Sequence, residues 1–322
     1  MRALVTGGAG FIGRHLCRAL GKRGHDVASL DVQPLEMPGV AHRVGDIRDT
    51  ALLDELLPDV EVVHHLASVH LQVRATEEEF QAVNVRATRD LVTACARHGV
   101  RRLVHASSVG VFGHVEDPPA DEAAPKRPGN LYERSKLAGE VAALEAAAAH
   151  GQDVIVLRPA WAYGPGCPRT AKLLGAIASG RFLYVGRGEN LRHPVFVDDV
   201  VEAFARAAEA PAECAGRVYI IGGPSPLRLR ELVTECALAL GVPPPRRALP
   251  RPLAVGLGLG LEIACGALRR EPPFSRRSIA FFENDNAFDT SAAARDLGFV
   301  PRTTLAEGLA ATLEERREAA AA

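Results

Sequence analysis

An imbalance of charge and a pattern of paired cysteines are both missing from this sequence of 322 residues. Its formal net charge is −1 and no segment is rich in lysine and arginine, so nothing predicts binding to nucleic acid. The six cysteines are scattered without Cys-x-x-Cys spacing, and we expect them to be reduced thiols in a cytoplasmic protein. His64, His65 and His70 lack a matching set of carboxylates or cysteines, so no metal site is predicted.

Long hydrophobic runs are absent as well. The most apolar stretch, residues 253–268, contains Glu262 and several glycines. It is shorter than the roughly 20 residues that a membrane-spanning helix needs. We therefore expect no transmembrane segment but a buried or substrate-facing helix, with attachment to a bilayer surface as the minor alternative. The chain begins directly with a strand-like run, so no signal peptide is expected.

A glycine-rich turn follows that first run. Residues 3–6 are apolar, Gly7, Gly10 and Gly13 come next, and the following residues show helical spacing. This order is typical of a dinucleotide site, where backbone approaches a pyrophosphate at a helix N-terminus. A second strand-like run ends in Asp31, whose carboxylate can bind a ribose diol and repel a 2′-phosphate. The pattern predicts NAD, in preference to NADP, as the cofactor.

Tyr132 and Lys136 are four residues apart, which places them on one face of a helix. A nearby ammonium favours the phenolate and lowers the pKa of a tyrosine from its ordinary value of about 10. Tyr132 could then exchange a proton with an alcohol or a ketone near neutral pH. Together with a dinucleotide site, this pair predicts hydride transfer at a carbon that carries a hydroxyl group.

Strand-like and helix-like segments alternate through the first half of the chain. The alternation predicts an α/β fold, with a doubly wound parallel (Rossmann) sheet and a smaller C-terminal substrate-binding cap. We expect residues 1–165, with a returning strand and helix near 190–222, to bind NAD, and residues 166–189 and 223–322 to bind the substrate. The expected strands are 3–6, 26–31, 42–44, 60–67, 102–107, 154–158 and 218–221. The expected helices are 13–23, 50–57, 81–98, 135–149, 170–179, 198–209, 227–240 and 304–318.

Several short motifs occur in an order that one enzyme family shares. They are residues 6–13 (TGGAGFIG), 45–47 (GDI), 65–68 (HLAS), 84–88 (NVRAT), 107–113 (SSVGVFG), the Tyr132/Lys136 pair and 157–159 (LRP). With these motifs the chain resembles an extended short-chain dehydrogenase/reductase of the NAD-dependent epimerase/dehydratase family. That group includes sugar epimerases, dehydratases and 3β-hydroxysteroid dehydrogenases. The resemblance continues to residues 296–301 and covers nearly the whole chain.

The resemblance implies that Ser108, Tyr132 and Lys136 are the catalytic residues. Ser108 would donate a hydrogen bond to the substrate oxygen, and Lys136 would also bond the nicotinamide ribose. Sugar dehydratases carry Asp-Glu after the catalytic hydroxyl residue, whereas this chain has Val109 and Gly110 there. No carboxyl group at those positions could protonate a leaving hydroxyl, so dehydration is disfavoured.

The resemblance also implies a set of cofactor-binding positions. Asp46 and Ile47 would lie against the adenine. Leu66 and Ala67 would line the nicotinamide side, and Asn84 would begin the helix beneath the site. The full set is Gly7, Gly10, Phe11, Ile12, Gly13, Asp31, Asp46, Ile47, Leu66, Ala67, Asn84, Tyr132, Lys136 and Pro159.

Substrate preference divides between two branches of the family. Arg192 matches the position of an arginine that binds a nucleotide-sugar diphosphate. Trp161, however, stands where sugar epimerases usually carry Asn, and residues 253–268 and 286–289 resemble the hydroxysteroid dehydrogenase branch. We take Ser108, Trp161 and Arg192 as the substrate-binding residues.

The sequence narrowly favours a nucleotide-sugar 4-epimerase, because Arg192 has a positive binding role. The alternative is a 3β-hydroxysteroid-dehydrogenase-like enzyme or a ketoreductase for a hydrophobic hydroxy or keto substrate. A cofactor-binding regulator without catalysis is a third possibility, against which Ser108, Tyr132 and Lys136 argue. We also expect a homodimer, paired through the alanine- and leucine-containing helices 81–98 and 135–150.

Overall fold

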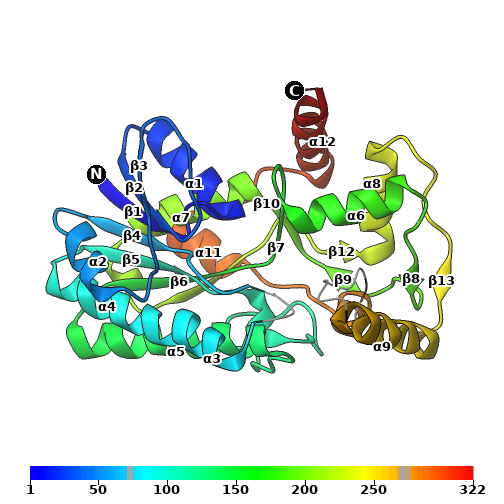
Figure 1. The fold of residues 1–322 in the computed structure, drawn as a ribbon, viewed down its shortest axis with the longest axis horizontal. Coiled ribbons are helices and arrows are strands. Elements are labelled where there is room, and N and C mark those ends of the chain that lie inside the picture. Colours follow the sequence, from blue (N-terminus) through cyan, green and yellow to red (C-terminus); the bar gives the residue numbers. More distant parts are fainter. Residues whose placement is uncertain (71–74, 268–273, 275, 322) are drawn as a thin grey trace.

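A seven-stranded parallel sheet organises the N-terminal half of the computed structural model, which describes residues 1–70, 75–267, 274 and 276–321 (Figure 1). The strand order is β3-β2-β1-β4-β5-β6-β11. It reverses direction between β1 and β4, and ligands of such sheets bind at the carboxyl ends of the strands at this point. The strands are β1 (Arg2–Thr6), β2 (Asp26–Asp31), β3 (Val40–Val44), β4 (Val62–His65), β5 (Arg102–Ala106), β6 (Val154–Pro159) and β11 (Val218–Ile221). The predicted doubly wound parallel sheet is confirmed.

Helices cover both faces of this sheet because its strands bury side chains on both sides (Figure 1). Val5 faces one core, which contains side chains of α1 (Phe11–Lys22), α7 (Val197–Glu209) and α11 (Ser291–Leu297). Its neighbour Leu4 faces the other core, with α2 (Thr50–Leu56), α4 (Ala87–Arg97) and α5 (Leu131–His150). Successive residues of a strand point to opposite faces, so near-continuous apolar runs fit a three-layer fold.

The helix predicted over residues 81–98 begins earlier and has an irregular centre. It starts with α3 (Glu77–Phe80), whose N-cap Thr76 forms a capping box with Glu79. A π-helical turn, η1 (Gln81–Arg86), then joins α3 to α4. The Thr-x-x-Glu pattern marks the true start and was overlooked in the sequence.

The C-terminal half packs around a separate apolar core. Buried side chains of this core come from three helices, α6 (Pro168–Ala178), α8 (Leu229–Ala239) and α12 (Leu305–Ala321). Short two-stranded ladders connect them, and none of these ladders was predicted because their strands have only two or three residues. They pair β7 (Trp161–Tyr163) with β10 (Pro194–Phe196), β9 (Leu191–Arg192) with β12 (Leu227–Arg228), and β8 (Tyr184–Val185) with β13 (Ala248–Leu249).

The apolar run 253–268 forms most of helix α9 (Arg251–Ala267), and its last residue lies outside the described residues. The expectation of a buried helix is only partly met. Ala254 is buried, but Leu253 is 61% exposed and Leu257 is 49% exposed. Helix α10 (Arg276–Glu283) packs beside α9 and supplies Phe281 and Phe282 to the neighbouring core. In the part of the chain that the structure describes, no helix is long and apolar enough to cross a membrane.

Candidate active site

The loop between β1 and α1 forms a cradle that only glycine can build. Gly7 has a φ of 75°, and a Cβ on it would lie 2.6 Å from the backbone nitrogen of Ala67. A Cβ on Gly13 would lie 2.1 Å from the carbonyl oxygen of Gly7. Gly10 is the N-cap of α1 and offers no side-chain hydrogen bond, so the first N–H groups of the helix can face an anion.

Asp31 ends the neighbouring strand β2 and is fixed beside this cradle. Its Oδ2 accepts a hydrogen bond from the backbone N–H of Ala9 at 3.0 Å. Its Oδ1 accepts one from the N–H of Gln33 at 2.9 Å. The carboxylate therefore has a set position at the carboxyl end of β2, where its negative charge opposes a 2′-phosphate.

Asp46 and Ile47 follow the edge strand β3 and have different surroundings. Arg48 holds Asp46 by a hydrogen bond from Nη2 at 2.6 Å, and this bond lowers the pKa of the carboxyl group. Ile47 is buried in the core beneath α2. The carboxylate of Asp46 is thus held in place by Arg48, whereas the side chain of Ile47 packs in the core.

The remaining predicted cofactor positions lie at the same edge of the sheet, where the carboxyl ends of the strands meet the glycine loop. Leu66 and Ala67 follow β4 directly and are partly buried, and Pro159 is buried at the end of β6. Phe11 and Ile12 open helix α1 and pack against the apolar cluster that contains Tyr163. All of these residues lie at carboxyl ends of sheet strands or at the start of the first helix.

Asn84 lies within the π-helical turn η1, so the expectation that it begins a helix is wrong. Its Oδ1 accepts from the N–H of Val69 at 2.7 Å, and its Nδ2 donates to the Val69 carbonyl at 3.0 Å and to Ser135 Oγ at 2.8 Å. Asn84 therefore ties the segment after β4 to helix α5. π-Helical turns are frequent at functional sites, and this one carries the side chain that joins the segment after β4 to the helix of Tyr132.

Ser108 and Tyr132 form a side-chain hydrogen bond at the carboxyl end of β5. Ser108 follows β5 as the N-cap of the short helix η2 (Val109–Phe112), and its Oγ accepts from the N–H of Gly110 at 3.0 Å. Tyr132 lies in the first turn of α5, which Asn130 caps. Burial raises the pKa of Tyr132, while the charge of Arg169 and a hydrogen bond with Ser108 lower it.

Lys136 occupies a different place from the one expected. It is buried, and its Nζ donates to the backbone carbonyl of Ala106 at the end of β5. Burial lowers the pKa of Lys136 to about 8, while Glu140 raises it. The charges that affect the pKa of Tyr132 are those of Arg169 and Glu133, so the expectation that Lys136 lowers this pKa is wrong for this structure. Its ammonium points toward the sheet instead.

A carboxyl group also lies close to Gly110, where the sequence indicated none. A Cβ on Gly110 would lie 3.0 Å from the Cγ of Glu133. Burial raises the pKa of Glu133, while the backbone N–H of Gly129, which donates to its Oε2 at 2.7 Å, lowers it. This carboxyl group thus belongs to the start of α5, and its Oε2 already accepts a hydrogen bond from the backbone.

His70 and Arg169 join this site, although no motif in the sequence assigns either residue to it. The ring of His70 lies against that of Tyr132 with 4.6 Å between centroids. Arg169, at the start of α6, places its Nη2 3.1 Å from Nε2 of His70. The two residues are 99 positions apart, and no local motif signals this contact between the start of α6 and the segment that follows β4.

Arg192, on strand β9, is a buried cation with few partners. Its Nη1 donates to Oδ1 of Asn286 at 2.8 Å, and its Cζ lies 4.5 Å from the ring centroid of Phe281. Its buried Nε has no hydrogen-bond partner among the described residues. Burial and, to a smaller extent, the charge of Arg169 lower the pKa of Arg192 to about 10, while the charge of Asp285 opposes this shift.

Trp161 forms the adjoining wall, its ring 5.9 Å from that of Phe281 in an edge-on arrangement. The next aromatic ring along is that of Phe282, 5.3 Å from Phe281. The guanidinium of Arg192 therefore lies behind aromatic side chains rather than at an open surface.

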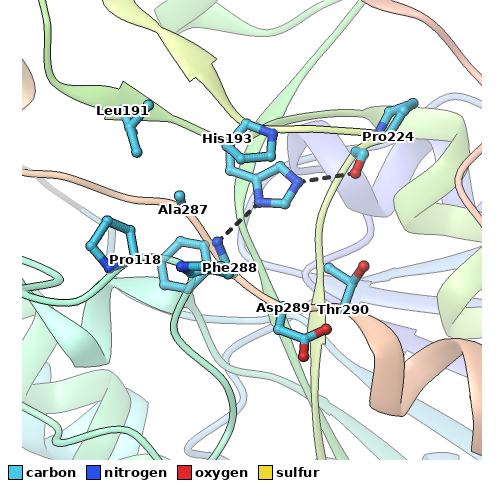
Figure 2. A pocket seen from close by; sticks show the side chains of 11 residues that line it. Pro118, Leu191, His193, Pro224, Ala287, Phe288, Asp289 and Thr290 are labelled. Atoms are coloured by element: carbon cyan, nitrogen blue, oxygen red, sulfur yellow. Dashed lines mark hydrogen bonds between the residues drawn. The ribbon is translucent and has the colours of Figure 1, made fainter.

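A cavity of about 320 Å³ is lined by Leu191 and His193, the chain neighbours of Arg192, while Arg192 itself is not among its lining residues (Figure 2). In Figure 2 the ring of His193 bridges two segments, with Nε2 donating to the Gly223 carbonyl at 3.0 Å and Nδ1 accepting from the N–H of Phe288 at 3.3 Å. Prolines and backbone form much of the remaining lining, and Tyr132 is not among the lining residues. His193 thus holds the wall of this cavity in place.

The chain belongs to the NAD dependent epimerase/dehydratase family, whose model matches residues 3–222. It is an NAD-dependent enzyme of the extended short-chain dehydrogenase/reductase type. The residues of the crevice fit that cofactor, because the Cβ-free cradle at Gly7 and Gly13, the open first turn of α1 and the fixed carboxylate of Asp31 meet at one edge of the sheet.

Relatives with established names fall into both branches that the sequence indicated. The chain is 30% identical to a 2-alkyl-3-oxoalkanoate reductase of Stenotrophomonas maltophilia, over 96% of this chain and 97% of that protein. It is 33% identical to a UDP-glucose 4-epimerase of Mycolicibacterium smegmatis, over 98% of each chain. The solved structure of MoeE5 in complex with UDP-glucuronic acid and NAD is 31% identical, with a TM-score of 0.80, covering 99% of this chain and 100% of that one.

Proposed function

We propose that this enzyme interconverts a secondary alcohol and a ketone on a hydrophobic substrate. The observation that carries the proposal is the position of Phe281, whose ring covers the guanidinium of Arg192. Trp161 extends this apolar wall, and Arg192 itself is only 9% exposed. A diphosphate would need an accessible guanidinium, whereas an alkyl or ring substrate would pack against these aromatic side chains.

Tyr132 acts as the proton-transferring group in this proposal. NAD, when bound, supplies the hydride acceptor or, in its reduced form, the hydride donor. Burial keeps the pKa of Tyr132 above its ordinary value, so its phenol holds a proton at neutral pH and can donate it to a ketone oxygen. Ser108 donates a hydrogen bond to the same oxygen as negative charge develops on it. The site is thereby prepared for reduction, in line with the reductase among its relatives.

Lys136 and Asn84 support the site from below. The ammonium of Lys136 is held at the carboxyl end of β5 by the Ala106 carbonyl, and it would turn to a ribose hydroxyl only when a cofactor offers one. Asn84 joins the segment at Val69 to Ser135, one turn along the helix from Tyr132. The helix that carries the proton donor is therefore anchored to the strand that faces the nicotinamide side.

The experiment is a comparison of substrates with purified enzyme and NAD. A racemic 2-hexyl-3-hydroxydecanoic acid and other hydrophobic secondary alcohols should give net NADH, measured by absorbance, whereas UDP-glucose should give none. UDP should also leave the thermal unfolding midpoint of the NAD-bound enzyme unchanged. The absence of NADH with every hydrophobic alcohol would overturn the proposal.

A nucleotide-sugar 4-epimerase is the second function to be tested, because the buried Nε of Arg192 has no hydrogen-bond partner in the part of the chain that the structure describes. In that case UDP should stabilise the NAD-bound enzyme, and Arg192→Ala should remove most of the stabilisation. The control is Arg228→Ala, which removes an exposed arginine from the strand paired with β9. An epimerase would also convert UDP-glucose without net NADH, because the hydride returns to the sugar.

We also propose a homodimer and the division of the chain given by its sequence. Helices α4 and α5 pack side by side over one face of the sheet, and Val141 of α5 is 46% exposed. Residues 1–165 with the returning segment near 190–222 would bind NAD, and residues 166–189 and 223–322 would bind substrate. Light scattering that shows a monomer at micromolar concentration would contradict the dimer.

A further inference from the structure

Arg169 is the second residue of helix α6 and points its guanidinium at the catalytic tyrosine through one intervening ring. Its Nη2 lies 3.1 Å from Nε2 of His70, and the His70 ring lies 4.6 Å from the ring of Tyr132. Since an arginine can only donate, Nε2 of His70 accepts, and this histidine is neutral. One imidazole therefore separates the cation from the phenol.

The charge of Arg169 reaches three groups of the site. It lowers the pKa of Arg192 after the larger effect of burial, and it does the same to the pKa of His70. It also opposes the rise that burial causes in the pKa of Tyr132. Among the described residues, no carboxylate lies within ion-pair distance of either Arg169 or Arg192. Asp285 offsets part of this effect at Arg192. An anion bound beside Arg169 would relieve the repulsion between the two cations.

We propose that Arg169 binds a carboxylate that the substrate carries on the carbon next to the reacting one. The substrate is then a hydrophobic β-hydroxy or β-keto acid, an inference that rests on the proposed function. An arginine suits this task because its planar fork can form two parallel hydrogen bonds to a carboxylate. His70 holds the fork in place, and the bound carboxylate sets the adjacent carbinol before Tyr132 and Ser108.

The position of Arg169 distinguishes a carboxylate from a diphosphate. The anion must lie close to the reacting carbon, because only the His70 ring stands between the guanidinium and the phenol. In a nucleotide sugar that reacts at C4, the diphosphate is attached to C1, on the far side of the ring. In a β-hydroxy acid, one carbon separates the carboxylate from the carbinol, and one relative is named a 2-alkyl-3-oxoalkanoate reductase, for a keto acid of this class.

The reaction leaves the carboxylate unchanged. In the oxidising direction the carbinol C–H bond breaks and its hydride goes to NAD, while the O–H proton goes to the phenolate of Tyr132 and from there to solvent. The products are the β-keto acid, NADH and one proton. Reduction is the reverse, with the phenol of Tyr132 donating to the ketone oxygen.

The test compares an acid with its neutral ester in the full-length enzyme. The oxidation of racemic 2-hexyl-3-hydroxydecanoic acid and of its methyl ester is to be measured for four proteins. These are the wild type, Arg169→Gln, Arg169→Lys and the control Arg181→Gln. Arg181 is an exposed arginine just beyond the other end of α6. The ratio of kcat/KM for the acid to that for the ester should fall about ten- to a hundredfold in Arg169→Gln. Arg169→Lys should recover part of that ratio, and Arg181→Gln should keep it.

A second measurement separates binding from a purely structural role. Besides Arg169, the groups that act on Tyr132 are Ser108 and Glu133, and neither changes in the variant. Loss of Arg169 therefore removes a charge that lowers the pKa of Tyr132, and the pH profile for the ester should move to higher pH in Arg169→Gln. An unchanged acid-to-ester ratio with an unshifted profile would overturn the assignment.

Other outcomes identify which proposal has failed. If wild type oxidises neither the acid nor the ester, the proposed function itself is wrong. If it oxidises both and Arg169→Gln keeps the wild-type ratio, only the carboxylate assignment is wrong. If Arg169→Gln instead loses thermal stabilisation by UDP while the ratio is unchanged, the anion that Arg169 binds is a diphosphate, which also overturns the assignment.

Discussion

Arg158 in the N-terminal half and Arg192 in the C-terminal half are both buried, with 2% and 9% of their surface exposed. Arg158 forms two hydrogen bonds to the carboxylate of Glu140, at 3.0 and 2.5 Å. Arg192 has one amide oxygen and an aromatic ring, and its Nε has no partner among the described residues.

This contrast separates a scaffold from a site. A buried ion costs several kcal/mol unless it is paired, and in the first half the chain supplies the pair itself. The C-terminal half supplies no carboxylate for the buried guanidinium of Arg192 among the described residues. Arg169 is exposed, so water can solvate its charge. The N-terminal half therefore pairs its buried arginine with a carboxylate, whereas the C-terminal half surrounds its buried arginine with an amide oxygen and an aromatic ring.

The largest effect should come from Tyr132→Phe, which removes the only proton that the proposal routes to the substrate. We expect kcat to fall about 10²–10⁴-fold, because that is the usual contribution of a positioned acid or base. Titration with NAD should still show near-normal affinity, since the glycine cradle is intact. A Tyr132→Phe enzyme that turns over at a near-normal rate would assign proton transfer to another group.

The second largest effect should be on stability, when the buried ion pair between Arg158 and Glu140 is broken. Glu140→Ala leaves Arg158 buried without its carboxylate, and we expect the free energy of unfolding to fall by about 3–5 kcal/mol. Urea unfolding monitored by circular dichroism measures this loss. The control is Glu55→Ala, which removes an exposed partner of Arg43 and should cost about 1 kcal/mol at most. Equal losses in both variants would erase the contrast between paired and exposed charges.

Lys136 is a third buried cation and sharpens the comparison, because its ammonium has only a carbonyl as hydrogen-bond acceptor. Burial lowers its pKa from 10.5 to about 8 in the folded protein. Between pH 8 and 10.5 the unfolded chain therefore binds more protons at this residue, and its contribution to stability rises with pH across that window.

The difference in stability between wild type and Lys136→Met should isolate that contribution. We expect the wild type to gain about 3 kcal/mol relative to the variant as the pH rises through the window. Urea unfolding of both proteins, without cofactor, at the two ends of the window measures the gain. A constant difference would mean that the ammonium is better solvated than its burial indicates.

The scaffold could be predicted from the sequence much more fully than the substrate side. Near-continuous apolar runs and a glycine turn specify parallel strands locally, and those at residues 26–31 and 218–221 have the predicted bounds. The strands of the two-stranded ladders have two or three residues, too few to show a period. Contacts such as Arg169 with His70 join segments 99 positions apart and leave no local pattern.

The sequence also could not predict the direction in which a buried side chain points. The spacing of Tyr132 and Lys136 predicted a shared helix face, but it could not show that the ammonium bonds the Ala106 carbonyl of β5. Likewise, the alignment of Arg192 with a phosphate-binding position could not show that Phe281 covers it. Both differences arise where tertiary packing decides between two partners that are available to one flexible side chain.

The smallest expected effect concerns Asp31, the anionic counterpart of the arginines in this comparison. Its two oxygens accept from the N–H groups of Ala9 and Gln33, so the chain stabilises this charge without a cation. We expect NAD to bind at least about tenfold more tightly than NADP, a difference of about 1.4 kcal/mol. Asp31→Ala should narrow this ratio, because it removes both the ribose contact and the repulsion of a 2′-phosphate.

The matched variant Asp31→Asn removes the charge and keeps one acceptor oxygen, which can serve one of the two backbone N–H groups. Fluorescence titrations of both variants with NAD and NADP would therefore separate the electrostatic part of the preference from the shape of the cradle. If Asp31→Asn narrows the ratio as much as Asp31→Ala, charge alone sets the choice of cofactor. Equal binding of NAD and NADP by the wild type would instead show that the open first turn of α1 dominates, and that Asp31 serves mainly to hold the loop.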